Sequence, residues 1–268
     1  MRVVGVGDNT VDIYLHQGLM FPGGNAVNVS VFANRLGAYA SYIGWLGNDE
    51  RGNLIHDALV EENIDLSHVR RIDGENAFCE IDVVEGDRIF GDFSEGVRNQ
   101  IVLNDEDYEF ISEHSLTHTS IYSFVEPFIE KLHKYSRKLS FDFSQDWDTD
   151  YLEKILPHVD IAILSSKERQ LEDNRPLMQM AKTKGPELIL ITGGDQGALL
   201  FDGQGFYHQG IVEVTDIADT LGAGDAFAAN FMVEYLKGVH IPDALAHAAE
   251  FAASACQSHG AFGHGAPI

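Results

Sequence analysis

The residues best suited to do chemistry together lie in one stretch, Asp219-Thr-Leu-Gly-Ala-Gly-Asp225. The small residues Gly222, Ala223 and Gly224 precede Asp225, and the segment that follows is typical of a helix ending at Gly238. The first N–H groups of a helix lack internal partners and carry partial positive charge, so this entry could hold a phosphate. Asp225 could then take the proton of a substrate hydroxyl that attacks the phosphorus. Taken alone, the same residues could equally form a capped helix after an ordinary turn.

Two carboxylates, Asp8 and Asp12, follow the first apolar segment of the chain. Carboxylates accept hydrogen bonds from sugar hydroxyls and bind amines, and ligands of α/β proteins bind beyond the carboxyl ends of the strands. The spacing therefore favours a polar-substrate site that includes Asp8 and Asp12. For Asp8, a helix cap or a solvated turn is an equally good interpretation.

A second candidate for substrate contact is the segment from Gly23 to Asn28, which leads into an Ala- and Val-rich helical pattern. Two adjacent glycines allow a ligand to approach the backbone closely. The Asn28 amide can both donate to and accept from vicinal hydroxyls. Gly24 and Asn28 are therefore candidate sugar-binding residues.

The stretch around Asp225 resembles the C-terminal signature of the ribokinase/PfkB family of carbohydrate kinases, and it matches at Asp219, Thr220, Gly222, Ala223, Gly224, Asp225 and Phe227. The resemblance implies that Asp225 is the catalytic base and that the backbone of Gly222 to Gly224 stabilises the transferred phosphate. The Gly-Gly-x-x-x-Asn segment is similar to the N-terminal signature of the family. It implies that Gly24, Asn28 and Asp12 contact the sugar.

Two weaker matches concern the nucleotide and its metal. Residues 191–197, Ile-Thr-Gly-Gly-Asp-Gln-Gly, are similar to the nucleotide loop of the family, which implies that Thr192, Gly194 and Gly197 face ATP phosphates. The segment from Ser165 to Glu168 stands where the family has Asn-x-x-Glu. The resemblance thus implies Mg²⁺ near Glu168, with Ser165 in place of the usual Asn; Mg²⁺ often keeps several waters beside a carboxylate. Gly222 and Gly224 are also expected to contact ATP.

Composition narrows the class of protein and its partners. A chain of 268 residues with 44% hydrophobic content can bury a substantial core, so we expect one domain over residues 1–268. The net charge of −24 argues against nucleic acid and membrane as partners, since both need a basic surface. Cys79 and Cys256 suit buried reduced thiols, and without a signal or spanning segment the expected location is the cytoplasm.

The elements that must position these residues alternate along the chain. Short apolar or β-branched segments, expected as strands, cover residues 3–6, 40–46, 116–121, 139–143, 160–164 and 188–191. Segments with helical spacing cover residues 26–36, 53–62, 125–138, 149–156 and 175–184. This alternation predicts an α/β fold with a mainly parallel sheet and helices on both faces. The family resemblance implies that this sheet has the ribokinase-like fold.

One segment interrupts the alternation. Residues 77–84 and 88–93, joined by a Glu-Gly-Asp turn, predict a β-hairpin with no helix between its strands. The family resemblance implies that residues 74–97 form a small β-lid over the sugar, and that the lid could mediate a homodimer. An ordinary surface hairpin is the alternative.

Within the family, several segments resemble bacterial fructoselysine 6-kinases, among them residues 7–14, 87–97 and 141–144. The resemblance implies ATP-dependent phosphorylation of the 6-hydroxyl of a fructosamine. Such a substrate carries an ammonium and, in fructoselysine, a carboxylate, for which Asp8, Asp92 and Arg88 are candidate partners. A kinase of a plain ketose, pentose or nucleoside remains the alternative, and a non-catalytic sugar or nucleotide sensor is the rival of another class.

Overall fold

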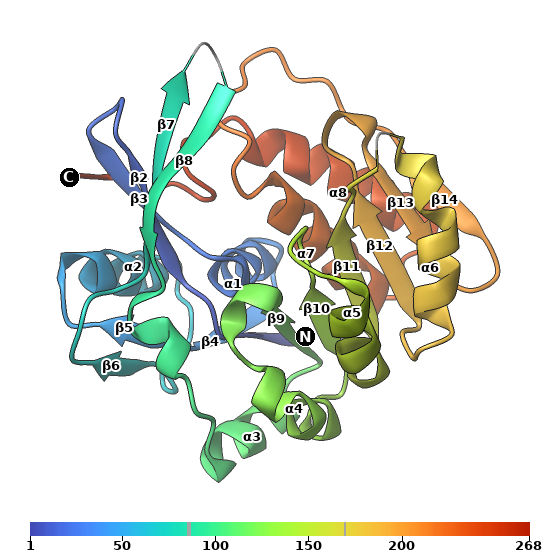
Figure 1. Ribbon diagram of the computed structural model, residues 1–268, viewed down its shortest axis with the longest axis horizontal. Coiled ribbons are helices and arrows are strands. Elements are labelled where there is room, and N and C mark those ends of the chain that lie inside the picture. The colour runs from blue at the N-terminus through green and yellow to red at the C-terminus, as the bar shows by residue number, and fades with distance from the viewer. Residues whose placement is uncertain (85–86, 169) are drawn as a thin grey trace.

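The computed structural model describes residues 1–84, 87–168 and 170–268, with side chains described outside residues 83–90. An eight-stranded sheet crosses the molecule (Figure 1), and its strands in spatial order are β14 (Phe206–Gln209), β13 (Ala198–Phe201), β12 (Leu188–Thr192), β11 (Ile161–Ser165), β10 (Leu139–Asp142), β9 (Leu116–Ser120), β1 (Arg2–Val6) and β4 (Tyr39–Ile43). Pairing is parallel from β12 to β4 and antiparallel from β12 to β14. The six parallel strands therefore end at one edge, where a ligand site of this fold class lies.

Helices cover both faces of this sheet, as the sequence predicts. On one face pack α1 (Asn25–Arg35), α2 (Glu50–Glu61), α7 (Ala223–Leu236) and α8 (Ile241–Ala255). On the other pack α3 (Asp105–Ser112), α4 (Ile129–Tyr135), α5 (Thr149–Ile155) and α6 (Arg175–Lys182). Successive side chains of a strand point to opposite faces, so Leu190 joins the first core while Ile189 and Ile191 join the second. This explains the continuous apolar strands.

A second sheet of five strands contains the two strands of the predicted hairpin and three further strands. Its spatial order is β15 (Ala266–Pro267), β3 (Leu19–Gly23), β2 (Thr10–Tyr14), β7 (Phe78–Val84) and β8 (Asp87–Ser94). The β7–β8 hairpin projects beyond the main sheet (Figure 1). Asp12 was expected with Asp8 beyond the end of the first apolar segment, whereas the structure places it within a strand of its own, β2. The signal was present, because residues 10–14 are rich in β-branched and aromatic side chains.

The single strand expected at residues 40–46 is divided in two. It becomes β4 and β5 (Trp45–Gly47), and β5 pairs with β6 (Arg70–Ile72) in a separate two-stranded sheet. The break falls at Gly44, where a Cβ would lie 2.0 Å from the hydroxyl oxygen of the buried Tyr42. The strand therefore ends where the ring of Tyr42 occupies the space of a side chain.

Two further findings complete the fold. The two cysteines are free and half-buried, so the predicted reduced state holds while full burial does not. Of the helices in the described ranges, none combines the length and the apolar character needed to cross a bilayer.

Candidate active site

The start of α7 is built to leave its backbone accessible. Gly222 precedes the helix with φ of 76°, in the left-handed region that favours glycine, and a Cβ there would lie 2.6 Å from the Cβ of Ala261. At Gly224, by contrast, no described atom outside its chain neighbours and the backbone of α7 lies within 4 Å of where a Cβ would be. The glycines therefore have different tasks. Gly222 fits a tight space against the C-terminal segment, and Gly224 leaves open space in front of the first helical turn.

The carboxyl group of Asp225 lies in that first turn and is held by two amides of α1. Asn28 Nδ2 donates to Asp225 Oδ2 over 2.6 Å, and Asn25 Nδ2 donates to Oδ1 over 2.7 Å. Burial raises the pKa of Asp225 to about 7, with a further rise from the negative charge of Asp142, while the two amides oppose the shift. A carboxyl with this pKa can accept a proton near neutral pH.

Asn25 and Asp142 are candidate site residues that were not predicted from the sequence. Asn25 Nδ2 also donates to Asp142 Oδ2 over 2.9 Å, so one amide bridges two carboxyl groups. Burial raises the pKa of Asp142 to about 6. The signal that could have found Asp142 is its position, because it is the last residue of β10 and therefore lies at the same sheet edge as Asp8.

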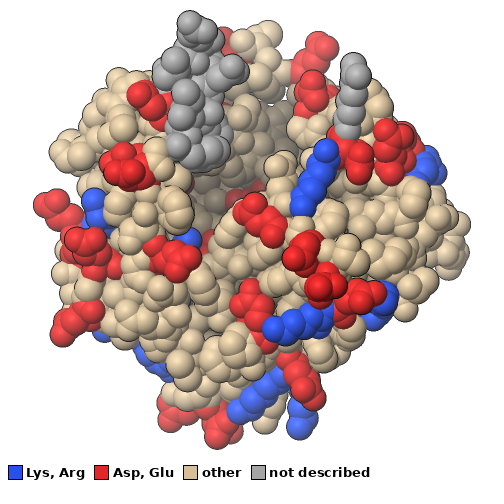
Figure 2. Space-filling model, viewed as in Figure 1, with Lys and Arg blue, Asp and Glu red and all other residues tan. Residues whose placement is uncertain are grey.

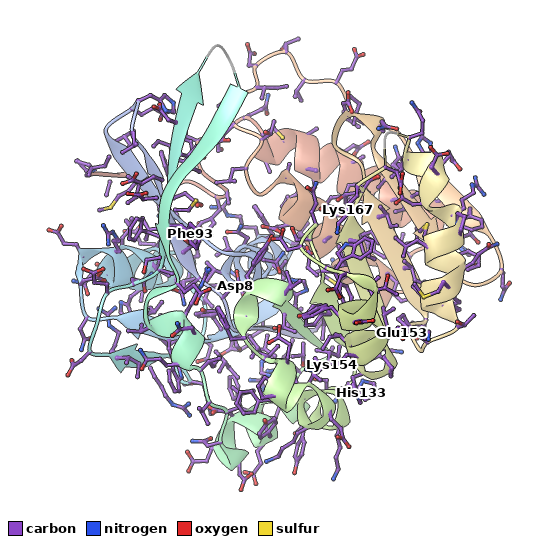
Figure 3. The ribbon with its side chains drawn as sticks, viewed as in Figure 1. Asp8, Phe93, His133, Glu153, Lys154 and Lys167 are labelled. Atoms are coloured by element: carbon purple, nitrogen blue, oxygen red, sulfur yellow. The ribbon has the colours of Figure 1, made fainter. Side chains whose placement is uncertain are left out.

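Asp8 lies beyond the carboxyl end of β1 (Figure 3) and is 2% exposed. Its carboxyl oxygens accept from the backbone N–H groups of Asn25 and Ala26, over 2.7 and 3.2 Å, and from the hydroxyls of Ser120 and Ser123, over 2.7 and 2.9 Å. A carboxylate offers about four acceptor positions, so these bonds leave little capacity for a sugar hydroxyl. The structure thus favours the cap interpretation: Asp8 holds the start of α1.

The other predicted sugar ligands surround the same helix start. Asp12 is buried on β2, and a Cβ at Gly23 would lie 2.6 Å from its Oδ2. Gly24 has φ of 107°, and a Cβ there would lie 2.6 Å from the Cα of Asn9. Asn28 is 5% exposed, and its Oδ1 has no hydrogen-bond partner among the described residues. The structure therefore brings Gly24 and Asn28 to Asp225, with Asp12 on the adjoining strand of the lid sheet.

Among the described side chains, no hydrogen bond or ion pair joins Asp225 to the lid residues predicted to bind the substrate. The side chain of Arg88 lies outside the described residues. Asp92 is exposed on β8, where Gly91 and Asp92 together face Glu80 in an irregular register. Phe93 (Figure 3) has 71% of its surface exposed. It pairs with Cys79, which in turn pairs with Asp12, so the three share one face of the sheet. An exposed aromatic on the face of Asp12 was not anticipated.

Arg98 is a second charged residue near the sugar segment that sequence reasoning missed. It lies in a short 3₁₀ turn, Gly96–Gln100, and its Nη1 donates to the backbone oxygen of Asn9 over 3.1 Å. The Asn9 side chain in turn bonds to the buried Tyr42 hydroxyl and to Asn76. This polar network ties the base of the lid to the loop that carries Asp8.

The predicted nucleotide residues come together at the ends of β11 and β12. Ser165 and Thr192 are register partners, so the segments that follow them lie side by side. Gly197 has φ of 82°, and a Cβ there would lie 2.0 Å from the backbone oxygen of Gln209. Gly194, φ 59°, is exposed. These conformations explain the glycines as turn residues and leave an open loop beyond β12.

Glu168 lies in the segment after β11 and is exposed. Over the described ranges no group of three or more His, Cys, Asp or Glu side chains is arranged to hold a metal ion. A single exposed carboxylate is nevertheless compatible with Mg²⁺, which is often bound through one or two carboxylates, waters and substrate phosphates. Lys167 lies next to it, with Nζ donating to the Trp147 backbone oxygen over 2.6 Å (Figure 3).

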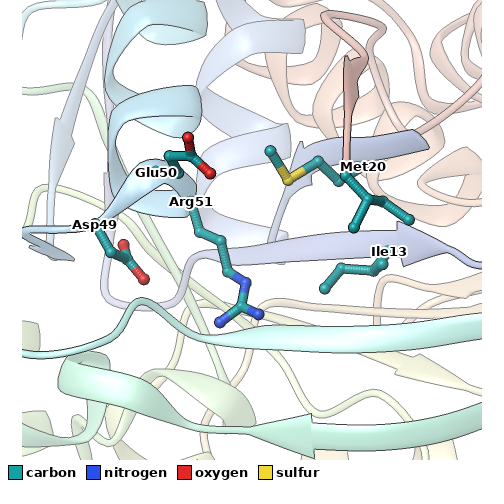
Figure 4. A pocket seen from close by; sticks show the side chains of 6 residues that line it. Ile13, Met20, Asp49, Glu50 and Arg51 are labelled. Carbon is teal, nitrogen blue, oxygen red and sulfur yellow. The ribbon is translucent and has the colours of Figure 1, made fainter. Parts of the chain in front are cut away.

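The molecule is hollowed between the β7–β8 hairpin and the elements opposite it (Figure 2). Two cavities lie elsewhere. One of about 270 Å³ lies between the lid sheet and the start of α2 (Figure 4), and it is lined by Ile13, Met20, Asp49, Glu50, Arg51 and Ile268. Another, of about 400 Å³, lies between α7 and α8. Neither is lined by Asp225 or by another predicted site residue, so the candidate site is the open cleft.

Comparison with solved structures defines the fold. The chain superimposes on the ribokinase of Arabidopsis thaliana complexed with ribose and ATP with a TM-score of 0.82, at 20% identity, covering 97% of this chain and 93% of that one. A fructokinase with bound ATP from Xylella fastidiosa gives a TM-score of 0.80 at 19% identity, covering 97% and 94% of the two chains. The predicted ribokinase-like fold is confirmed.

Sequence comparison defines the family. The profile described as pfkB family carbohydrate kinase matches residues 2–264. A protein named fructosamine kinase FrlD, from Bacillus subtilis (strain 168), is 41% identical over 271 residues, covering 100% of this chain and 95% of that protein. The fructoselysine 6-kinase of Escherichia coli (strain K12) is 35% identical over 257 residues, covering 96% and 98%. The chain belongs to the pfkB family, and it is a carbohydrate kinase.

Proposed function

We propose that this kinase transfers the terminal phosphoryl group of ATP to the 6-hydroxyl of a fructosamine such as fructoselysine, with Asp225 as the general base. The observation that carries the proposal is the Asp225 carboxyl, held by two amides at the start of α7 with its pKa raised to about 7. A base is most effective when its pKa lies near the working pH, because a substantial fraction is then ionised and the ionised form still binds a proton.

The residues around Asp225 supply position and charge stabilisation. The first turn of α7, entered through Gly222 and the open Gly224, presents N–H groups toward a phosphoryl group in transfer. The Asn28 Oδ1 atom offers an acceptor for a sugar hydroxyl, since its amide nitrogen is engaged by Asp225. Asp12 and the backbone at Gly24 complete the proposed sugar site, and Asp8 acts through α1 by fixing its first turn.

ATP is proposed to lie over the ends of β11 and β12, with its phosphates at Thr192, Gly194 and Gly197. Glu168, exposed beside this loop, is the residue that would hold Mg²⁺. When bound, the ion would neutralise phosphate charge, which matters in a chain with a net charge of −24. The chain itself supplies the helix start and the backbone of the loop.

The choice of a fructosamine is supported by two relatives that cover nearly the whole chain and bear the names fructosamine kinase and fructoselysine 6-kinase. Asp92 and Arg88 remain proposed partners of the substrate ammonium and carboxylate. A kinase of a plain ketose, pentose or nucleoside would need the same groups at the start of α7, so only a substrate comparison separates these activities. Phe93 offers an apolar surface for the part of the substrate beyond the sugar.

The test is Asp225→Asn, which keeps the shape of the side chain and removes the base. Loss of a positioned general base costs about a hundredfold to ten-thousandfold in rate, so we expect turnover to fall by that factor. Thermal unfolding measured alongside should show a folded protein. Turnover within a few-fold of wild type would remove Asp225 from its proposed role.

A further inference from the structure

The amide of Asn25 is shared between the two carboxyl groups of the site whose pKa values are raised. Asn25 is the first residue of α1, and its Nδ2 lies 2.7 Å from Asp225 Oδ1 and 2.9 Å from Asp142 Oδ2. An amide NH₂ carries two hydrogens, so one can be given to each carboxyl group. The start of α1, the start of α7 and the end of β10 are therefore joined through one side chain.

The oxygen of this amide faces the ring of His118. Asn25 Oδ1 lies 2.6 Å from Nε2 of His118, and Nδ1 of the same ring lies 2.8 Å from the Ser140 hydroxyl oxygen. Burial lowers the pKa of His118 to about 4, so the ring is neutral at neutral pH. With the amide oxygen of Asn25 facing the ring, the neutral imidazole carries its proton on Nε2, donates it to Asn25 and accepts at Nδ1 from Ser140. In this arrangement the NH₂ group of Asn25 faces the two carboxyl groups.

Asp142 is equally fixed. It is 9% exposed, and its Oδ1 accepts from the backbone N–H of Ser144 over 2.7 Å. The charged and titratable groups that face Asp225 are Asp142 and, farther away, Asp8, with the neutral His118 behind Asn25. The Asp8 carboxyl group accepts hydrogen bonds from the start of α1 and from two serines. The charge of Asp142 therefore affects the pKa of Asp225 more than the charge of Asp8 does.

We propose that Asn25 is a positioning residue of phosphoryl transfer, whose amide joins Asp142 to Asp225 and so fixes the direction of the base and the charge beside it. This role rests on Asp225 being the base, as proposed above. Two opposed effects on Asp225 follow. Asn25 stabilises its ionised form by hydrogen bonding, and Asp142 destabilises that form by its charge.

The experiment is the pH profile of kcat/KM for wild type, Asn25→Ala and Asp142→Asn, with ATP and Mg²⁺ saturating. In Asn25→Ala the base loses a donor, so the acidic limb of the profile should move to higher pH. The reaction is expected to lose about tenfold to a hundredfold in kcat through misplacement of the base, with KM for the sugar changed far less. In Asp142→Asn a negative charge is removed, so the acidic limb should move to lower pH.

A matched control is Asp57→Asn, which removes an exposed carboxylate on α2 and should leave the profile in place. Limbs that stay at the wild-type pH in both variants, or that move in the same direction, would overturn the role of Asn25. Should Asn25→Ala fail to fold, Asn25→Ser serves instead. A carboxyl ¹³C NMR titration, with Asp225→Asn identifying the signal of Asp225, follows the same shifts without turnover. A failure of the proposed function can be told apart from a failure of this role for Asn25. If Asp225 is not the base, Asp225→Asn itself stays active.

Discussion

At the scale of single residues, the site is a set of carboxyl groups whose surroundings give them different tasks. Asp8 is saturated by four donors and anchors α1, whereas Asp225 and Asp142 share one amide and have raised pKa values. The sequence motif identified Asp225 and Asn28 because residue types at fixed spacing are enough for that. It did not identify Asp142, the last residue of an apolar strand, which reaches the site through the parallel order of β9, β10 and β11.

The raised pKa of Asp142 has a consequence for stability. Its pKa is about 6 in the folded protein against an ordinary value of 3.8, so this group stabilises the fold below pH 3.8 and that contribution is lost as pH rises toward 6. Asp142→Asn lacks this dependence. Between pH 5 and pH 8 this group should lower the free energy of unfolding of wild type by about 1 kcal/mol, and Asp142→Asn should lack that loss. Urea denaturation of both proteins at the two pH values measures the difference. An unchanged difference between the two proteins at both pH values would contradict the assignment.

Glu168 gives a prediction about the metal. Glu168→Gln keeps the size of the side chain and removes the charge, so more Mg²⁺ should be needed for half-maximal activity, while the sugar KM stays the same. The measurement is an activity titration with Mg²⁺ at fixed ATP. Glu172→Gln, which removes an exposed carboxylate paired with Arg175, is the control. Coincident titrations for Glu168→Gln and wild type would exclude Glu168 from the metal site.

At the scale of elements, the start of α7 and the C-terminal segment depend on each other. The Asp219 carboxyl accepts from the backbone N–H groups of Leu221 and Gly260, over 2.9 and 3.1 Å, and from the Tyr14 hydroxyl of the lid sheet. Gly222 then packs against Ala261. The signature around Asp225 is thus partly explained by packing: Asp219 ties the loop to two other segments. The spacing of the signature does not reveal those partners.

A comparison of two glycines tests this packing. Gly222 and Gly238 have φ values of 76° and 84°, but only Gly222 has an atom close to where a Cβ would be. Gly238→Ala should therefore cost only the penalty of a left-handed alanine, about 1 kcal/mol, and leave kcat intact. Gly222→Ala should cost more stability and reduce kcat, because the helix start must shift. Thermal unfolding and steady-state kinetics measure both, and equal effects of the two substitutions would refute the packing account.

At the scale of the whole molecule, the alternation of apolar strands and helical segments was sufficient to predict an α/β fold with a mainly parallel sheet, and the family resemblance predicted its ribokinase-like form. Periodicity fixes which residues are buried, and parallel strands with buried faces need helices on both sides. The five-stranded lid sheet was not foreseen beyond its hairpin. The adjacent strands β2 and β3 were not recognised as a pair, and β7 and β15 lie far from them in sequence and join them only through tertiary contacts. The β8 strand is the outer strand of this sheet and exposes Phe93, and a homodimer through the lid stays a prediction.

The central claim is that the substrate is a fructosamine. The most direct test is to measure kcat/KM of the purified enzyme for fructoselysine and for fructose, and to identify the product by ³¹P NMR. A fructosamine presents an ammonium to an acidic lid, and a desolvated charge pair contributes roughly a few kcal/mol, so we expect fructoselysine to be favoured by about a hundredfold or more and phosphorylated at the 6-hydroxyl. Asp92→Asn should narrow this gap by weakening only the amine-bearing substrate. Equal kcat/KM values for the two sugars in wild-type enzyme would contradict the fructosamine assignment.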